Sequence, residues 1–332
     1  MRQQGDDNGR VTTGHVLHNM IRVKNAHLEY LYETPLYYEA GKGTGFEVYK
    51  PSFSIIERSR ISNNRLPSCL YVHAKDKATW LRELQKGLNI RLRSDLKSDN
   101  PAMVKSTLVT LADEIIKEPG ECIENTVTTL DIIFDEYLRN RSVIDSLVHV
   151  IAKDYSTAVH SVNVMALTLR FSLFCNMEEA EAKKMGLAAL LHDVGKVKVN
   201  NRILKASRKL TNAEFETIKK HTIFGYEMLT ACNLPEDICL CALNHHERAD
   251  GSGYPNGAAE VSPEAEIIGF IDCYEALTCN ERPYRNAESP FDALSRIKGE
   301  LFGGKFKGDV FEKFVLSLGK DSPVVSGFFA HY

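Results

Sequence analysis

The sequence predicts a mainly α protein, in which a helical bundle carries the functional site and follows a smaller α/β or mostly β domain. Three observations support this prediction. Apolar residues recur at helical spacing through most of the chain after residue 95. Short alternating apolar runs, which are typical of strands, are confined to the first 95 of the 332 residues. Histidines and aspartates fall on the inner faces or at the ends of successive predicted helices, where bundles place metal ligands.

The composition is that of a globular protein, and it limits the classes of function. Hydrophobic residues make up 43% and charged residues 26% of the chain. No apolar run approaches the ~20 residues that span a bilayer, and the polar stretch Met1 to Arg10 lacks the apolar core of an export signal. We therefore expect a cytoplasmic protein without a membrane partner. The net charge of −3 also argues against a nucleic-acid polymer as partner, because that requires a basic face.

Residues 1–95 are predicted to form an N-terminal regulatory or sensor domain of unknown type. The expected strands are Gly45–Tyr49, Phe53–Ile56 and Cys69–His73, separated by Gly, Pro and Asn. An amphipathic helix is expected to begin near Lys75 and to carry Trp80, Leu81, Leu84 and Leu88 on one side. The histidines of this region lack ligand spacing and acidic partners, and we interpret them as surface or packing residues: His15, His18, His27 and His73.

Residues 96–145 are predicted to form a helical linker, broken at Pro119-Gly120. Residues 146–332 are predicted to form the domain that carries the site, with helix after helix and no convincing strand. The expected helices cover about 154–174, about 178–192, a segment after the N-cap Thr211 with its capping-box partner Glu214, about 236–246, and about 263–279. In the third helix Phe215, Ile218, His221 and Gly225 share one face, which predicts that His221 points inward.

The eight cysteines show no paired zinc-ribbon spacing. Several lie in helical apolar patterns, which indicates reduced core residues. The alternative for Cys239 and Cys241 is a metal or redox pair, although both lie in the middle of a predicted helix rather than at a turn.

The stretch His192-Asp-Val-Gly-Lys196 is the centre of the predicted site. An imidazole offers one lone pair to a single ion, whereas a carboxylate has two oxygens, so Asp193 is the natural bridge between two cations. Gly195 is expected to let the backbone leave the preceding helix through a left-handed or otherwise strained conformation. Lys196 would then place a positive charge beside the metals, an arrangement that suits an anionic phosphate.

Taken singly, each histidine or aspartate has a simpler reading as a hydrogen-bonded core residue. Taken together, the following residues lie on facing or terminal positions of different helices: His160, His192, Asp193, His221, His245, His246 and Asp272. Burying so many ionisable groups without a compensating cation costs several kcal/mol per charge. Two divalent cations would remove that cost.

These residues lie within a longer pattern that resembles the HD-GYP family of bacterial cyclic di-GMP phosphodiesterases. The pattern consists of His192-Asp-Val-Gly-Lys196, Lys209-Leu-Thr, Lys220-His221 with Gly225, His245-His-Glu-Arg-Ala-Asp-Gly-Ser-Gly-Tyr-Pro255, Asp272, Ala276-Leu-Thr278 and Arg282-Pro-Tyr-Arg285. The resemblance covers roughly residues 145 to 320, and its signature around Gly-Tyr-Pro is long and highly specific. It implies an all-helical HD-type bundle in which residues 146–332 are the catalytic domain.

The resemblance also implies roles for single residues. The implied metal ligands are His160, His192, Asp193, His221, His245, His246 and Asp272, with Asp193 and Lys196 as catalytic residues. Substrate would be bound by Lys196, Tyr254, Arg282 and Arg285. The loop Gly253, Tyr254 and Pro255 would govern substrate access or dock diguanylate cyclase domains, or would simply be a rigid turn.

Two departures from the family pattern stand out. Glu275 occupies a position where Asp is usual, and the segment from Asp272 to Arg282 is one residue longer than usual, which leaves the role of Arg282 open. Some members place a glutamate one turn before the upstream histidine and hold a third metal. Ser156 takes that position here, so we expect two ions.

The implied activity is metal-dependent hydrolysis of cyclic di-GMP to pGpG and/or GMP. The implied cofactors are two divalent ions, iron or manganese, with nickel or zinc as alternatives. A homodimer is a further expectation. Two rival functions stay open at this point: hydrolysis of another cyclic dinucleotide, or a non-catalytic cyclic di-GMP receptor that acts through protein partners.

Overall fold

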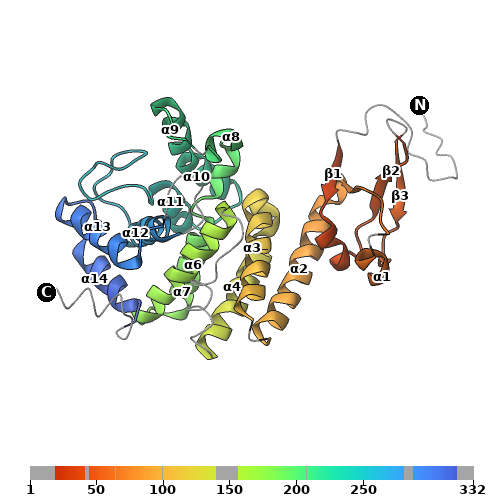
Figure 1. Ribbon diagram of the computed structural model, residues 1–332, viewed down its shortest axis with the longest axis horizontal. Helices are drawn as coiled ribbons and strands as arrows, with labels where there is room; N and C mark the ends of the chain where they lie inside the picture. Colours follow the sequence, from red (N-terminus) through yellow and green to blue (C-terminus); the bar gives the residue numbers. More distant parts are fainter. Residues whose placement is uncertain are drawn as a thin grey trace. The chain divides into compact units, whose positions relative to one another are not determined.

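The computed structural model describes residues 19–41, 45–63, 65–98, 100–139, 156–206, 208–279 and 287–319. The chain divides into two compact units, Met1–Arg91 and Leu92–Tyr332. The first contains the strands and the second is helical (Figure 1). The predicted fold class, mainly α with a small strand-containing N-terminal part, is confirmed.

The first unit is built on a four-stranded antiparallel sheet in the order β1-β4-β2-β3. Its strands are β1 (Met20–Val23), β2 (Leu36–Glu39), β3 (Phe46–Lys50) and β4 (Leu70–His73). The unit also contains η2 (Asn25–Tyr30), α1 (Arg58–Ser62), η3 (Ala74–Asp76) and most of α2 (Lys77–Leu96). Apolar residues of the sheet and of α2 are fully buried, among them Leu36, Leu70, Val72, Leu81 and Leu84.

The strand predictions for this unit are partly confirmed. β3 and β4 lie where the alternating runs predicted strands, and α2 begins two residues after the expected Lys75. The strand predicted at Phe53–Ile56 is wrong. Phe53 has a left-handed backbone with φ of 57°, and Lys50 Nζ donates to the carbonyls of Tyr32, Pro51 and Ser54, which ties the segment into a turn.

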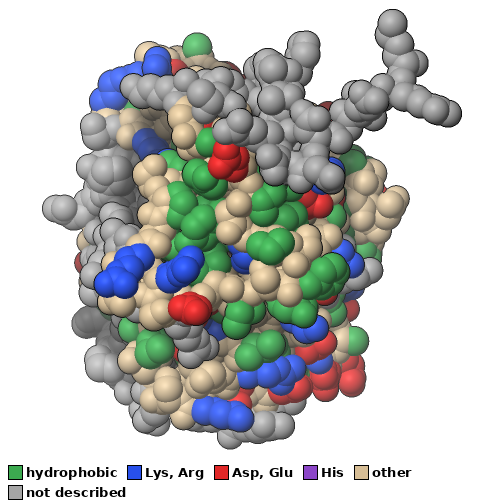
Figure 2. All heavy atoms as spheres, turned by 90° about the vertical axis from the view of Figure 1, so that its right-hand side faces the viewer, with side chains coloured by type: hydrophobic (Ala, Val, Ile, Leu, Met, Phe, Trp, Pro, Cys, Tyr) green, Lys and Arg blue, Asp and Glu red, His purple; other side chains and the backbone are tan. Residues whose placement is uncertain are grey.

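Hydrophobic side chains gather near the middle of the face drawn in Figure 2, with charged side chains mostly around them. The first unit exposes several large apolar side chains: Tyr32, Val48, Phe53 and Ile55. His27 in η2 is buried, which agrees with one of the two roles expected for it, that of a packing residue.

The regular elements of the second unit are all helices over its described residues. Its elements are α3 (Pro101–Lys117), α4 (Pro119–Arg139), α6 (Thr157–Phe174), α7 (Glu179–Leu191), η4 (Val194–Lys198), α8 (Asn201–Leu204), α9 (Asn212–Lys219), α10 (His221–Ala231), α11 (Glu236–Asn244), α12 (Pro263–Thr278), α13 (Pro290–Phe302) and α14 (Gly308–Ser317). Pro119 opens α4, so the predicted break there is confirmed.

Helix α6 forms the centre of this bundle. It is buried along nearly its whole length and packs against α3, α7, α12 and α14 (Figure 1). A helix that is apolar on all sides is typical of such a central position. Because α7 and α12 flank α6, polar residues on their inner faces meet in the interior of the unit.

The helix predicted after Thr211 is in fact two helices. The capping box between Thr211 and Glu214 is present as predicted, but the helix ends at Lys219 and α10 begins at His221. The four residues expected on one face therefore do not share it: His221 is buried, whereas Phe215 is 46% exposed. No described helix is long and apolar enough to cross a membrane.

All eight cysteines are free, and Cys239 and Cys241 are buried in α11. Burial raises the pKa of Cys241 to about 12, which disfavours the thiolate that metal or redox chemistry requires. The expectation of reduced core cysteines is therefore confirmed for this pair.

Candidate metal centre

Seven predicted ligands converge from five places in the helical unit. His160 comes from α6, His192 ends α7, Asp193 precedes η4, and His221 is the first residue of α10. The remaining three are His245 and His246 at the end of α11 and Asp272 on α12. All except His246 are buried. Three overlapping groups of these side chains have ligand atoms within 4.8 Å of one another.

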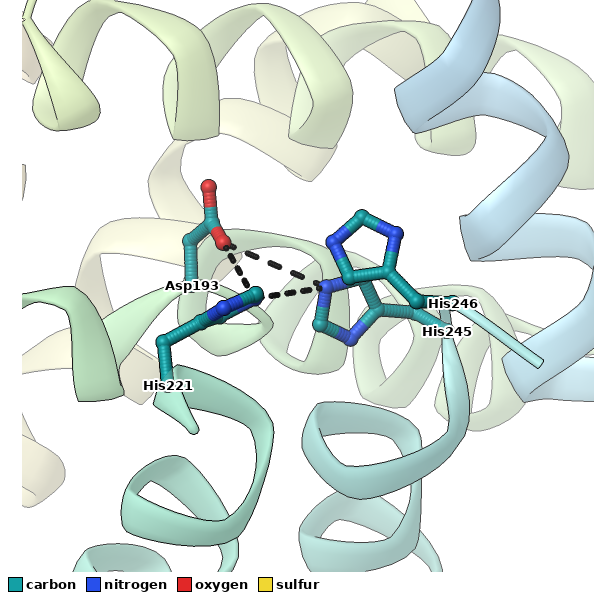
Figure 3. A group of neighbouring side chains, drawn as sticks. All are labelled: Asp193, His221, His245 and His246. Carbon is teal, nitrogen blue, oxygen red and sulfur yellow. Dashed lines mark hydrogen bonds and ion pairs between the residues drawn. The ribbon is translucent and has the colours of Figure 1, made fainter. Parts of the chain in front are cut away.

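The two oxygens of Asp193 face different sets of imidazoles. Oδ1 lies 3.2 Å from His221 Nε2 and 3.9 Å from His245 Nε2. Oδ2 lies 3.4 Å from the Nε2 atoms of both His160 and His192. Figure 3 shows the first set, with His246 beside His245. A carboxylate so placed can bind one cation through each oxygen.

Backbone carbonyls fix the tautomers of three of the histidines. Nδ1 of His192 donates to Ala189 O at 2.7 Å, and Nδ1 of His221 donates to Ile218 O at 2.7 Å. Nδ1 of His245 donates to Ala242 O at 3.0 Å. Because a carbonyl can only accept, Nδ1 carries the proton in each ring and Nε2 presents its lone pair to the interior. This is the orientation that metal-binding histidines require.

On the second side of Asp193, His160 and Asp272 complete the group. His160 Nε2 lies 2.9 Å from Asp272 Oδ1 and 3.3 Å from His192 Nε2. The other oxygen of Asp272 lies 3.8 Å from His246 Nδ1. Asp272 therefore lies close to one imidazole of each set.

The donor set fits divalent cations. Asp193 Oδ1 is buried and has no hydrogen-bond partner. The Nε2 atoms of His221 and His245 are 3.4 Å apart, so the lone pair of one nitrogen points at the lone pair of the other. A cation between these atoms satisfies the carboxylate oxygen and both lone pairs at once. Imidazole nitrogen mixed with carboxylate oxygen suits the first-row divalent metals.

The protonation states favour the same conclusion. Burial by itself would raise the pKa of Asp193, but the Lys196 ammonium and the adjacent imidazoles hold that pKa well below its ordinary value. Burial lowers the pKa values of His245 and His246, and neighbouring imidazoles lower them further. An ionised carboxylate and neutral imidazoles are the forms that bind metal.

His160 is held differently from the other histidines. Burial would lower its pKa, but the carboxylates of Glu275 and Asp272 outweigh this effect and raise it to about 9. Glu275 Oε2 lies 2.5 Å from His160 Nδ1, and Asn163 Nδ2 donates to Glu275 Oε1 at 2.7 Å. Sequence reasoning left the role of Glu275 open. Its spacing of three residues from Asp272 on one helix was the signal that it faces the same site.

We expect Glu275→Gln to lower metal affinity about 10- to 100-fold, because a neutral amide supports the His160 ring less well than a carboxylate does. Competition with a chromogenic chelator measures the affinity. Glu264→Gln, on the first turn of the same helix α12, is the control and should leave it unchanged. Equal affinities of Glu275→Gln and wild type would show that Glu275 does not orient His160.

Glycines let the helices approach closely enough to form the site. A Cβ on Gly195 would lie 2.0 Å from His221 O and 2.4 Å from Gly225 N, and a Cβ on Gly269 would lie 2.0 Å from His245 O. Gly195 is absent from the glycines with positive φ, so the expected left-handed exit is wrong. Close contact between η4 and α10 is the actual reason for a glycine at this position.

The Gly-Tyr-Pro loop packs against the same cluster. The Tyr254 ring lies over His246, with centroids 4.6 Å apart. Glu247, which sequence reasoning did not single out, is buried and accepts from the backbone N–H groups of Asn256 at 2.7 Å and Ala258 at 2.9 Å. A Cβ on Gly253 would lie 2.4 Å from Glu247 Cα. These contacts hold Tyr254 beside the histidines, next to Pro255 in a cis Tyr254–Pro255 peptide.

Of the predicted substrate contacts, Lys196 lies at the cluster. Its Nζ donates to Asp193 Oδ2, and its side chain is 23% exposed. Tyr254 also lies there, as described above. Arg282 and Arg285 lie outside the described residues, so their predicted contacts stay predictions.

Comparison with known proteins agrees with this geometry. Residues 138–301 match the model of the HD domain family. A cyclic di-GMP phosphodiesterase of Pseudomonas aeruginosa is 36% identical over 196 residues, which cover 57% of this chain and 46% of the relative. A 3'3'-cGAMP-specific phosphodiesterase of Vibrio cholerae is 32% identical over 166 residues, which cover 49% of this chain and 38% of the relative. The chain thus spans less than half the length of these relatives.

A solved structure gives independent support for the fold. An HDG"Y"P protein from Bdellovibrio bacteriovorus superposes with a TM-score of 0.61 at 15% sequence identity, covering 89% of this chain and 98% of the other. At this identity the likeness concerns the fold alone. The match of residues 138–301 to the HD domain, with the His-Asp cluster and the Gly-Tyr-Pro loop beside it, identifies the chain as a member of the HD-GYP family of HD-domain proteins.

Proposed function

We propose that this chain hydrolyses cyclic di-GMP to pGpG and/or GMP in a metal-dependent reaction. The observation that carries the proposal is the position of Asp193, whose two oxygens face two separate sets of imidazoles. The similarity to the cyclic di-GMP phosphodiesterase of Pseudomonas aeruginosa supports it.

The residues present divide into two ligand sets. His221, His245 and His246 would hold one cation with Asp193 Oδ1, and His160, His192 and Asp272 would hold the other with Oδ2. When bound, two such ions activate water and neutralise charge on the phosphoryl oxygens. We propose iron or manganese, with nickel or zinc as alternatives.

The position of Ser156 favours two metal ions rather than three. Its hydroxyl caps α6 by accepting from the backbone N–H of Val159 at 3.3 Å. A neutral hydroxyl engaged in a cap is a weak ligand and brings no charge to compensate a third cation.

Lys196 is the group of this chain that would stabilise negative charge developing on the phosphate. It is partly exposed, whereas Asp193 beside it is buried, so its ammonium can reach both the ligand cluster and an entering anion. Tyr254 would contact the substrate from the loop side, and Arg282 and Arg285 would add positive charge there.

We expect Lys196→Met to lower kcat/KM for cyclic di-GMP by about 10²- to 10³-fold, the usual loss on removing one charge-stabilising donor from a transition state. Metal content should stay close to wild type, because the carboxylate and imidazoles remain. Lys198→Met is the control on the same short helix and should retain activity. Unchanged kcat/KM in Lys196→Met would remove Lys196 from the mechanism.

The first unit is proposed to regulate the second. No metal-binding group was found among its described residues, whereas all three such groups lie in the helical unit. We also propose that the Gly253–Pro255 loop docks diguanylate cyclase domains, that the chain forms a homodimer, and that it acts in the cytoplasm.

The second candidate function is hydrolysis of another cyclic dinucleotide, which the Vibrio cholerae relative favours. Incubation of the metal-loaded chain with cyclic di-GMP, 3'3'-cGAMP and cyclic di-AMP, followed by chromatography of the products, separates the two. We expect linear pGpG or GMP to form fastest from cyclic di-GMP. Faster turnover of another dinucleotide would favour the second candidate, and binding without any turnover would indicate a receptor.

A further inference from the structure

An exposed aromatic ring stands next to the metal centre on a helix that does not need it for packing. α9 has no buried residue, and its Phe215 is 46% exposed. Its ring and the Tyr254 ring meet in a T-shaped arrangement, with centroids 6.4 Å apart at an angle of 77°. Tyr254 in turn lies over His246. A continuous aromatic surface therefore runs from a ligand histidine outward to solvent.

A positive charge lies over both rings. Lys219 Nζ is 5.1 Å from the Phe215 centroid and 5.5 Å from the Tyr254 centroid. It is one helical turn from Phe215 and pairs with the Glu216 carboxylate at 2.7 Å. Lys219 also closes α9, two residues before His221. The ammonium thus lies over the aromatic surface and is paired with a neighbouring carboxylate.

We propose that Phe215, Tyr254 and Lys219 form a subsite for a purine base of the substrate. This inference rests on the proposed function, because a base held here belongs to a nucleotide whose phosphate is at the metal centre. A purine has a flat face that stacks on an aromatic ring. Guanine also presents the acceptors O6 and N7, which an adjacent lysine ammonium can bind. The chemistry of the three side chains matches both features.

Two simpler roles are possible for Phe215 and have to be separated from this one. Single exposed apolar side chains are common on protein surfaces. In addition, Phe215 could merely brace Tyr254 and so support the loop. If Phe215 stacks on a base, its loss weakens binding of a ligand that has bases and leaves binding of inorganic phosphate unchanged. Neither simpler role predicts this difference.

The test measures binding by calorimetry to the full chain loaded with manganese. The ligands are a non-hydrolysable phosphorothioate analogue of cyclic di-GMP and inorganic phosphate, which has no base. Phe215→Leu should weaken binding of the analogue by about 5- to 100-fold, the usual effect of losing one base–aromatic stack, and leave phosphate binding unchanged. Phe215→Tyr, which keeps a ring, should bind the analogue nearly as wild type does.

The matched control is Phe302→Leu. Phe302 on α13 is 77% exposed and also has a lysine, Lys298, over its ring at 6.0 Å. We expect no change in the affinity for either ligand. Equal analogue affinity in Phe215→Leu and wild type would overturn the subsite. An equal loss for analogue and phosphate would overturn it as well, because it would show a bracing role.

Lys219→Met tests the edge contact separately. This variant should bind the analogue several-fold more weakly and bind phosphate as wild type does. Lys205→Met, at the exposed end of α8, should change the affinity for neither ligand. A loss shared with phosphate would make Lys219 a phosphate contact and remove it from the base subsite. Failure of the proposed function looks different from all of these outcomes, because the wild-type chain would then either not bind the analogue or bind it without hydrolysing cyclic di-GMP.

Discussion

Replacing Asp193 by alanine is expected to remove both metal ions and to abolish hydrolysis of cyclic di-GMP. The substitution deletes an oxygen 3.2 Å from His221 Nε2 together with one 3.4 Å from both His160 and His192, so each cation loses a charged ligand. Without the negative charge of this carboxylate, the two cations would also repel each other more strongly. We expect at least a 10³-fold loss of kcat/KM, which exceeds the loss of any single neutral ligand.

His245→Ala is the comparison for this experiment. It removes one neutral imidazole that water can partly replace, so metal affinity and activity should fall only about 10- to 100-fold. Metal content by mass spectrometry, circular dichroism and hydrolysis should be measured side by side for both variants. If folded Asp193→Ala retained both metals and near-normal turnover, the bridging role and the mechanism built on it would be wrong.

Gly195→Ala is expected to damage the site without touching a ligand side chain. A Cβ at this position would lie 2.0 Å from the carbonyl oxygen of His221, and a backbone atom cannot rotate away as a side chain can. α10 must therefore shift and carry His221 with it. Overpacking of this kind lowers the free energy of unfolding by about 1–3 kcal/mol. We expect metal affinity to fall more than tenfold as well.

The matched control is Gly299→Ala in the interior of α13, where a Cβ would meet no atom within 4 Å. Because alanine favours helix over glycine, this variant should be more stable than wild type by about 0.5–1 kcal/mol. Urea denaturation gives the stabilities, and chelator titration gives the metal affinities. Wild-type metal affinity in Gly195→Ala would show that the contact between η4 and α10 does not position His221.

The arrangement of the ligand cluster was largely predictable because helical periodicity is a local property. Spacing alone placed His160 and Asp272 on inward faces, and the structure brings them within 2.9 Å of each other. Capping is local too, and Thr211 with Glu214 was predicted correctly for that reason. In each case the pattern that predicted the position of the residue lies within a single helix.

What the sequence did not reveal depends on contacts between distant segments. The spacing of Glu275 from Asp272 indicates which way it faces, but its partner His160 is 115 residues away, so no local pattern indicates the hydrogen bond between them. Gly195 was assigned a backbone conformation, whereas its real constraint comes from α10 passing beside it. In the first unit the expected strand at Phe53 is a turn stabilised by Lys50, which donates to the carbonyl of Tyr32, 18 residues earlier.

The most direct test of the two-metal account is anomalous diffraction at the manganese edge from crystals of the manganese-loaded chain. The account predicts two peaks, one between Asp193 Oδ1 and the group His221, His245 and His246, and one between Oδ2 and the group His160, His192 and Asp272. A single peak would contradict the bridging role of Asp193. A third peak beside Ser156 would contradict the count of two.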